Sequence, residues 1–172
     1  MDIRKILLQE YGKRGISKIV DYVGVNKDRF NQLINIYLEG PFRLTQKAAW
    51  PLSYCVQNHP ELIYPHFGKI LRFLKKPGIH DAVKRNTMRF LQFIKIPSKY
   101  RGEVANTAFG YLQDNTEAVA IRVFSMTVLA NIAQEEPDFK KELKIVIEDH
   151  LPYAKPAFRS RAKKVLSQID KS

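Results

Sequence analysis

The chain has 172 residues, of which 45% are hydrophobic and only one is cysteine. It is long enough to bury a core without disulfide bonds, and a single cysteine excludes a disulfide framework and a thiolate metal cluster. The formal net charge of +12, from 29 Lys and Arg against 17 Asp and Glu, favours anionic partners. No apolar run is long enough to cross a membrane, and Gln9 and Glu10 interrupt the amino-terminal stretch where a signal peptide is apolar. We therefore expect one domain of a cytoplasmic protein with no membrane partner.

Residues 1–25 are predicted to form a helical cap ahead of the first repeat. Apolar residues recur at helical spacing in two short groups, Ile3–Leu7 and Ile16–Val23. Gly12 and Gly15 lie between these groups, and glycine is a common helix breaker. Two short helices are the expected structure.

Four later segments of the chain can be laid over one another. They start at Phe30, Phe67, Val104 and Leu143, which are separated by 37, 37 and 39 residues. The positions i+3, i+4 and i+7 after each start are apolar except for Thr107 and His150, which places one stripe on one face of an α-helix. A second helix with the same period follows each of these helices, and one of its apolar columns consists of Leu44, Val83, Val119 and Phe158.

Turn and helix-breaking residues separate the predicted helices. Gly40–Pro41 and Pro77–Gly78 fall between the two helices of a pair. Pro51 and Pro65 fall inside the helical pattern, where each is expected to kink or restart the helix. The spacing predicts four helix pairs within one domain, at residues 26–58, 59–96, 97–135 and 136–172.

The chain resembles HEAT repeat proteins. Lys47–Leu52, followed by Asn58–Leu62 and Pro65–Phe67, is similar to the second helix of a HEAT repeat that continues through a Pro-Glu linker into the next first helix. Val119–Arg122 resembles the start of another second helix. The tryptophan, glycine and alanine positions of tetratricopeptide repeats do not recur. The resemblance spans about residues 26–170 and implies an all-α fold, a right-handed α-α superhelix (solenoid) of about four helix pairs behind the cap.

The sequence carries no recognisable catalytic, cofactor or metal motif. Its histidines have no metal-binding spacing, and no glycine-rich phosphate loop or serine nucleophile motif occurs. Cys55 lies in an apolar column, where a thiol is expected to be buried and unreactive. We therefore predict a non-enzymatic protein with no catalytic residue and no cofactor or metal site.

One enzymatic alternative follows from the fold alone. HEAT-like proteins include DNA glycosylases that excise alkylated bases, and these hold the lesion with several tryptophans and an acidic residue. Trp50 is the only tryptophan here, and no carboxylate can be matched to the catalytic one. A glycosylase-like activity is the less favoured alternative because the chemistry depends on the site and not on the fold.

A basic run is the strongest functional signal in the sequence. Ten Lys and Arg residues occur from Lys69 to Arg101, and Asp81 is the only acidic residue among them. On the second helix of this pair, Arg85 and Arg89 point away from the predicted buried stripe, with Met88 on the flank. The candidate anion-binding residues are Arg85, Arg89, Lys84, Gln92, Lys95, Lys75 and Lys76.

Two classes of partner fit this charge. Because second helices line the concave surface of HEAT-like stacks, the resemblance implies a basic groove, which suits an acidic protein segment. Backbone phosphates of nucleic acid are the alternative. A polar column of the second helices is instead expected to be structural, with heads bonded to carbonyls or carboxylates; it consists of Lys47, Asn86, Arg122 and Arg161. Tyr37 and Tyr54 could stack on bases, but core packing is the favoured interpretation.

Overall fold

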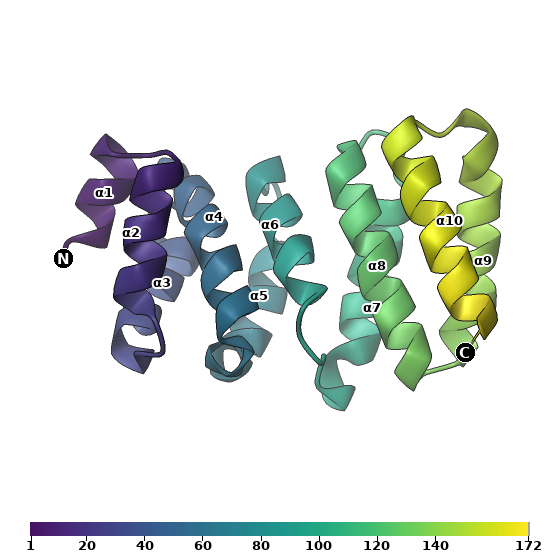
Figure 1. Cartoon of the computed structure of the whole chain (residues 1–172), viewed down its shortest axis with the longest axis horizontal. Coiled ribbons are helices and arrows are strands. Elements are labelled where there is room, and N and C mark those ends of the chain that lie inside the picture. Colours follow the sequence, from purple (N-terminus) through teal and green to yellow (C-terminus); the bar gives the residue numbers. More distant parts are fainter. Residues whose placement is uncertain (172) are drawn as a thin grey trace. The chain divides into compact units, whose positions relative to one another are not determined.

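The computed structural model describes residues 1–171, which fold into α-helices joined by turns, with no β-strand among them (Figure 1). The predicted all-α fold is confirmed. The helices in chain order are α1 (Ile3–Gln9), α2 (Lys13–Val23), α3 (Lys27–Glu39), α4 (Phe42–Asn58), α5 (Phe67–Leu74), α6 (Asp81–Leu91), α7 (Ser98–Gln113), α8 (Val119–Glu135), α9 (Asp138–His150) and α10 (Pro156–Lys171). Short 3-10 turns lie at Pro60–Leu62, Tyr64–His66 and Leu151–Tyr153.

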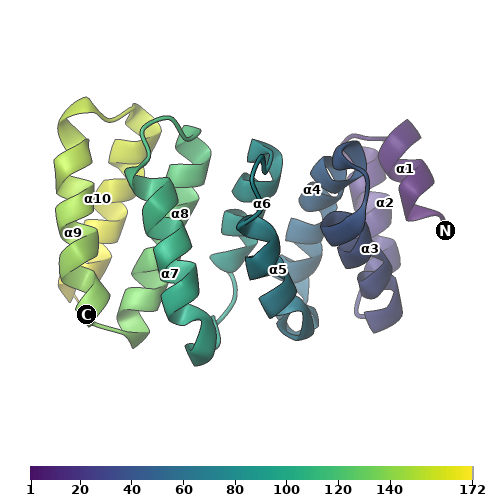
Figure 2. The same cartoon turned by 180° about the vertical axis from the view of Figure 1, so that it is seen from behind.

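The helices belong to two compact units, Met1–Ile94 and Lys95–Ser172. In the first unit α4 packs against both α2 and α6, so these three helices form one layer (Figure 1). Helices α3 and α5 contact each other and lie in front of that layer when the molecule is seen from behind (Figure 2). In the second unit α8 packs against α10, and α7 against α9. Each unit is thus built from helix pairs whose second helices lie side by side.

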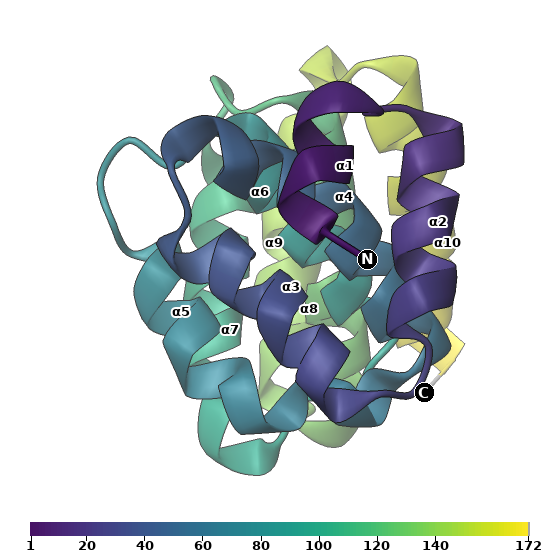
Figure 3. The same cartoon turned by 90° about the vertical axis from the view of Figure 1, so that its left-hand side faces the viewer.

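The two short helices expected in residues 1–25 are α1 and α2. Viewed from the amino-terminal end, α1, α2 and α3 are nearest the reader (Figure 3). Helix α1 contacts α2, α3 and α4. Its buried residues are Ile3, Ile6 and Leu7, so the first apolar group of the sequence covers the end of the layer that begins with α2 and α4.

Capping residues explain several helix starts, and the two prolines of the helical pattern lie in different settings. The Asp2 and Asn26 side chains accept hydrogen bonds from the amides of the first turn of α1 and α3. The turn that contains Pro65 precedes α5, as the restart predicts. Helix α4 continues through Pro51, so the helix does not restart there. Pro51 is buried, so core packing compensates there for the missing backbone hydrogen bond.

The repeated apolar columns form the core. Phe30, Phe67, Val104 and Leu143, the starts of the superimposed segments, are each at most 1% exposed. This confirms the helical interpretation of the period. Tyr37 is fully buried, as the core-packing prediction requires, and its hydroxyl lies 2.6 Å from the Thr87 hydroxyl, which connects α3 to α6.

The polar column of the second helices is structural, as predicted. Lys47 Nζ donates to the Leu7 carbonyl at 2.9 Å, and Arg122 Nε donates to the Leu112 carbonyl at 3.0 Å. Both carbonyls belong to the last turn of a helix, where no later amide of the same helix can pair with them. Asn86 donates to the Ala82 carbonyl within its own helix. Lys47 and Arg122 therefore cap the ends of α1 and α7, whereas Arg161 donates to the Thr127 hydroxyl.

Candidate anion-binding surface

Arg85 and Arg89 lie one turn apart on the surface of α6. Val83 and Thr87, on the opposite side of the helix, are 1% and 0% exposed. Arg85 is exposed and Arg89 is half-buried. The helical angle of about 100° per residue therefore places the two guanidinium groups on the same outward face of the α2, α4 and α6 layer.

Arg89 is held against an aromatic ring of the neighbouring helix. Its Cζ atom lies 4.5 Å from the centroid of the Tyr54 ring, and Tyr54 is on α4. The pKa of Tyr54 is lowered, first by a hydrogen bond from the Arg89 side chain and then by one from the Trp50 side chain. Arg89 is consequently oriented by its contacts, unlike a lysine or arginine that extends into solvent.

Two further aromatic residues extend this surface toward α1 and α2. Tyr11 and Trp50 pack edge to face, with ring centroids 5.8 Å apart. Burial raises the pKa of Tyr11, and the positive charge of Arg85 opposes that rise, which places Arg85 near the phenol. We call this surface the aromatic–arginine face; it consists of Tyr11, Trp50, Tyr54, Arg85 and Arg89.

A shallow pocket lies beside the face, between α2 and α4. Its volume is about 360 Å³. Trp50 and Tyr54 form part of its wall, together with Lys13 and Asp21. Lys13 is exposed, and its charge also contributes to the lowered pKa of Tyr54. The face therefore combines cations with a partly apolar recess.

The other candidate residues do not gather at this face. Lys75 and Lys76 are exposed at the end of α5 and beyond it, on the turn toward α6. Lys84 is half-buried on α6. The Gln92 side chain donates to the Arg89 carbonyl and so caps a backbone carbonyl in the last turn of α6. Lys95 belongs to the second unit, where its Nζ lies 3.4 Å from a Glu135 carboxylate oxygen.

Two sequence interpretations need correction. Met88 was expected beside the exposed face, yet it is fully buried. A helix packed within a layer is covered on its flanks as well as on its inner side, and the stripe of a single helix does not show this. Tyr54 was expected in the core, yet it is half-buried on the surface. The available signal was the one-turn spacing of Trp50 and Tyr54, which matches that of Arg85 and Arg89.

The repeated helix pairs and their capping column agree with the comparison to known families. The sequence profile of the HEAT repeat domain family matches residues 3–169. The chain belongs to the HEAT repeat family. No curated protein and no solved structure gives a significant match. HEAT repeats generally serve as scaffolds for protein interaction, and the family is typically non-catalytic.

Residues 1–171 contain no group of three or more His, Cys, Asp and Glu side chains able to hold a metal ion. Within the same range, no helix has the length and apolarity that crossing a bilayer requires.

The thiol of Cys55 provides a test of the packing of α4. Cys55 is 1% exposed, and burial raises the pKa of its thiol to about 12. Relative to a free cysteine, the thiolate fraction at mildly alkaline pH is lower by about a thousandfold. We expect iodoacetamide to label Cys55 in urea but not in the native HEAT repeat protein, as measured by mass spectrometry. Rapid labelling of the native protein would contradict the buried position.

Proposed function

We propose that this HEAT repeat protein is a non-catalytic scaffold that binds an acidic segment of a partner protein across the aromatic–arginine face. The observation that carries the proposal is a pair of arginines one turn apart, one of them held 4.5 Å above an aromatic ring. Guanidinium groups bind carboxylates through paired N–H donors. The outward position of both arginines makes this chemistry accessible to a partner.

The Tyr54 contact gives Arg89 an advantage over a mobile lysine. A guanidinium group that stacks on a ring keeps N–H donors at its edge, and its orientation is set before the partner arrives. Less side-chain entropy is then lost on binding. Arg85, one turn earlier on the same face, supplies a second donor group for the next acidic side chain.

Nucleic acid is the alternative ligand for this face. The ten basic residues from Lys69 to Arg101 favour phosphate contacts, and exposed aromatic rings can stack on bases. Arg89 already occupies one side of the Tyr54 ring, which leaves less of it for a base. We therefore favour carboxylates over stacked nucleotides.

A charge-reversal experiment tests the proposal. The probe is a fluorescein-labelled peptide of alternating Glu and Asp without apolar residues. The double variant Arg85→Glu with Arg89→Glu is expected to weaken its binding at least about tenfold in fluorescence anisotropy, because two charge-assisted hydrogen-bonding groups are lost. The matched control, Lys163→Glu with Lys164→Glu, changes the net charge equally on exposed residues of α10 and is expected to have little effect.

The alternative is tested with the same variants and labelled single-stranded and duplex DNA and RNA. Binding through phosphates would fall steeply with salt, with a log–log slope of about −0.9 per phosphate contacted on duplex DNA. If nucleic acid binds, the acidic peptide does not, and the double variant abolishes the binding, then the nucleic-acid alternative replaces the proposal. If the double variant and the α10 control lost the same amount of binding affinity, only the net charge of the protein would matter. That result would overturn both the acidic-segment proposal and the nucleic-acid alternative.

A further inference from the structure

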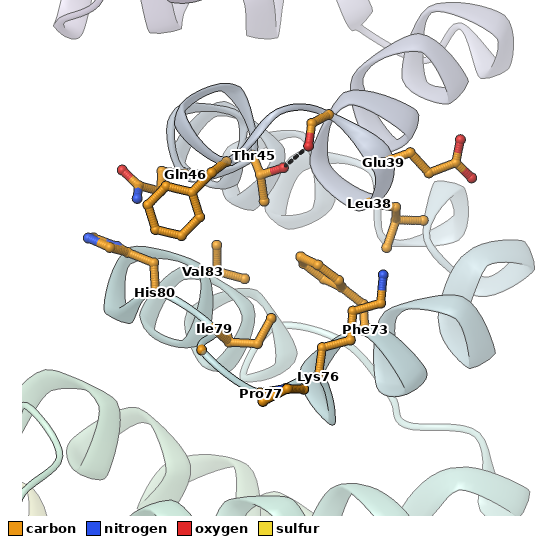
Figure 4. Close-up of a pocket in the computed structure, with 13 residues that line it drawn as sticks. Leu38, Glu39, Thr45, Gln46, Phe73, Lys76, Pro77, Ile79, His80 and Val83 are labelled. Atoms are coloured by element: carbon orange, nitrogen blue, oxygen red, sulfur yellow. Dashed lines mark hydrogen bonds between the residues drawn. The ribbon is translucent and has the colours of Figure 1, made fainter.

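A second recess lies in the first unit, away from the aromatic–arginine face. It is a pocket of about 300 Å³ between the turn from α3 to α4 and the turn from α5 to α6 (Figure 4). We call it the turn pocket. Its apolar side chains are chiefly those of Leu38, Phe42, Phe73, Ile79 and Val83.

The base of the turn pocket is apolar, and the Thr45 hydroxyl beside it already has a hydrogen-bond partner. Leu38, Phe73 and Val83 are 8%, 9% and 1% exposed, and Figure 4 shows Phe73, Ile79 and Val83 directed toward the open space. The Thr45 hydroxyl, which also lines the pocket, donates to the Gly40 carbonyl at 3.1 Å, which is the dashed bond in Figure 4. A ligand group that reaches this base meets the side chains of Leu38, Phe73 and Val83, and burying an apolar group against them is favourable.

The rim of the turn pocket exposes an aromatic ring. Phe42 is 63% exposed and packs edge to face against His80, with ring centroids 5.8 Å apart. An exposed phenylalanine beside an apolar recess is surface that a ligand can cover.

Backbone contacts hold the walls of the pocket in place. The Lys76 amide donates to the Phe73 carbonyl at 3.1 Å, and the Val83 amide donates to the His80 carbonyl at 2.9 Å. His80 Nδ1 accepts from the Ala82 amide at 3.0 Å. Gly78 has a φ of 72°, a left-handed conformation that glycine adopts without strain. The pocket is therefore formed before a ligand binds.

Positively charged side chains lie along one side of the turn pocket. An adjoining depression of about 290 Å³ shares Phe73 and Lys76 with it and adds Lys69 and Arg72. Lys76 Nζ lies 5.4 Å from the Phe73 ring centroid, so this cation stands at the junction of the two recesses. Glu39 is the one acidic residue among the residues that line them, and Figure 4 shows its carboxylate directed away from the turn pocket.

We propose that the turn pocket binds one large apolar side chain of an acidic peptide, whose carboxylates pair with Lys69, Arg72 and Lys76. The apolar base requires an apolar group, and the three cations beside it require negative charge next to that group. A nucleic-acid backbone supplies the charge but has no aliphatic or aromatic side chain for the recess. The proposal shares with the proposed function the class of partner, an acidic protein segment, but it concerns a separate site.

The test uses a fluorescein-labelled peptide, Asp-Asp-Glu-Leu-Phe-Glu-Asp-Asp, and the same peptide with Ser-Ser in place of Leu-Phe. The Leu-Phe peptide is expected to bind about tenfold to a hundredfold more tightly, because one large apolar side chain is buried. Ile79→Trp, which fills the pocket, and Phe42→Ser, which removes its rim, are each expected to abolish this preference. Phe42 is exposed, so Phe42→Ser tests the pocket without disturbing the core.

Charge is tested with a matched pair of neighbouring lysines. Lys76→Glu is expected to weaken binding of the Leu-Phe peptide at least about tenfold, whereas Lys75→Glu, an equal charge change at an exposed residue outside the pocket lining, is expected to change it much less. Thermal melts by circular dichroism verify that each variant is folded. Equal effects of the two lysine variants would overturn the proposal.

The remaining outcomes separate the two sites. Loss of the Leu-Phe preference in Phe42→Ser, with that preference retained in Arg85→Glu with Arg89→Glu, supports the turn pocket whether or not the aromatic–arginine face binds. Failure of the native protein to prefer the Leu-Phe peptide overturns the turn-pocket proposal and leaves the proposed function to its own test. If sedimentation shows a dimer that Ile79→Trp disrupts, the occupant is a second copy of the chain and the peptide proposal is wrong.

Discussion

Replacing Tyr37 with alanine is expected to lower the free energy of unfolding of the first unit by about 3–5 kcal/mol, the usual range for removing a buried aromatic ring. Tyr37 is fully buried, and its ring packs edge to face on Phe73 with centroids 5.2 Å apart. Alanine would leave a cavity between helices that are fixed by other contacts. Urea unfolding followed by Trp50 fluorescence measures the effect, because the only tryptophan lies in the same unit.

The conservative variant Tyr37→Phe separates packing from hydrogen bonding. It keeps the ring but removes the hydroxyl that lies 2.6 Å from the Thr87 hydroxyl. Thr87 still donates to the Val83 carbonyl at 2.8 Å, so we expect a loss of only about 1 kcal/mol. If phenylalanine destabilised the unit as much as alanine, the packing explanation would be wrong.

Replacing Arg122 with alanine is expected to destabilise the second unit by about 2–3 kcal/mol. The substitution removes the donor of the Leu112 carbonyl in the last turn of α7, and an unpaired buried carbonyl costs about 1–3 kcal/mol. It also removes the guanidinium group 4.8 Å from the Phe158 ring centroid. The gain from eliminating Arg122 Nη2, which is buried without a hydrogen-bond partner, offsets part of the loss. Urea unfolding monitored by circular dichroism measures the balance.

The chain itself suggests the control for this substitution. Lys47 occupies the same column as Arg122 in the first repeat, and its ammonium reaches the Leu7 carbonyl at 2.9 Å. Arg122→Lys is therefore expected to recover about half of the stability lost in Arg122→Ala, since it restores a donor but not the planar contact with Phe158. A lysine variant no more stable than the alanine variant would indicate that the ring contact, and not the carbonyl bond, is the dominant interaction.

The candidate binding residues show what helical spacing in a sequence can and cannot predict about a binding surface. The angle between successive residues was sufficient to place Arg85 and Arg89 outside the core, because Val83 and Thr87 occupy the opposite side of the same helix. The pattern could not show that Tyr54 of another helix would lie against Arg89. Lys75 and Lys76 belong to the same basic run, but they lie at the end of α5 and on the turn toward α6, and Lys76 lines a different recess.

The sequence by itself determined that this HEAT repeat protein is all-α, that the repeated apolar columns are buried and that the polar column of the second helices is structural. These features follow from the spacing of residues along single helices, because an apolar stripe at helical spacing must be covered. Only the tertiary structure decided that Tyr11, Trp50 and Tyr54 adjoin Arg85 and Arg89, and that two turns enclose a pocket above Phe73 and Val83. These arrangements depend on how neighbouring helices are rotated and offset against one another, which is set by packing between segments far apart in the chain.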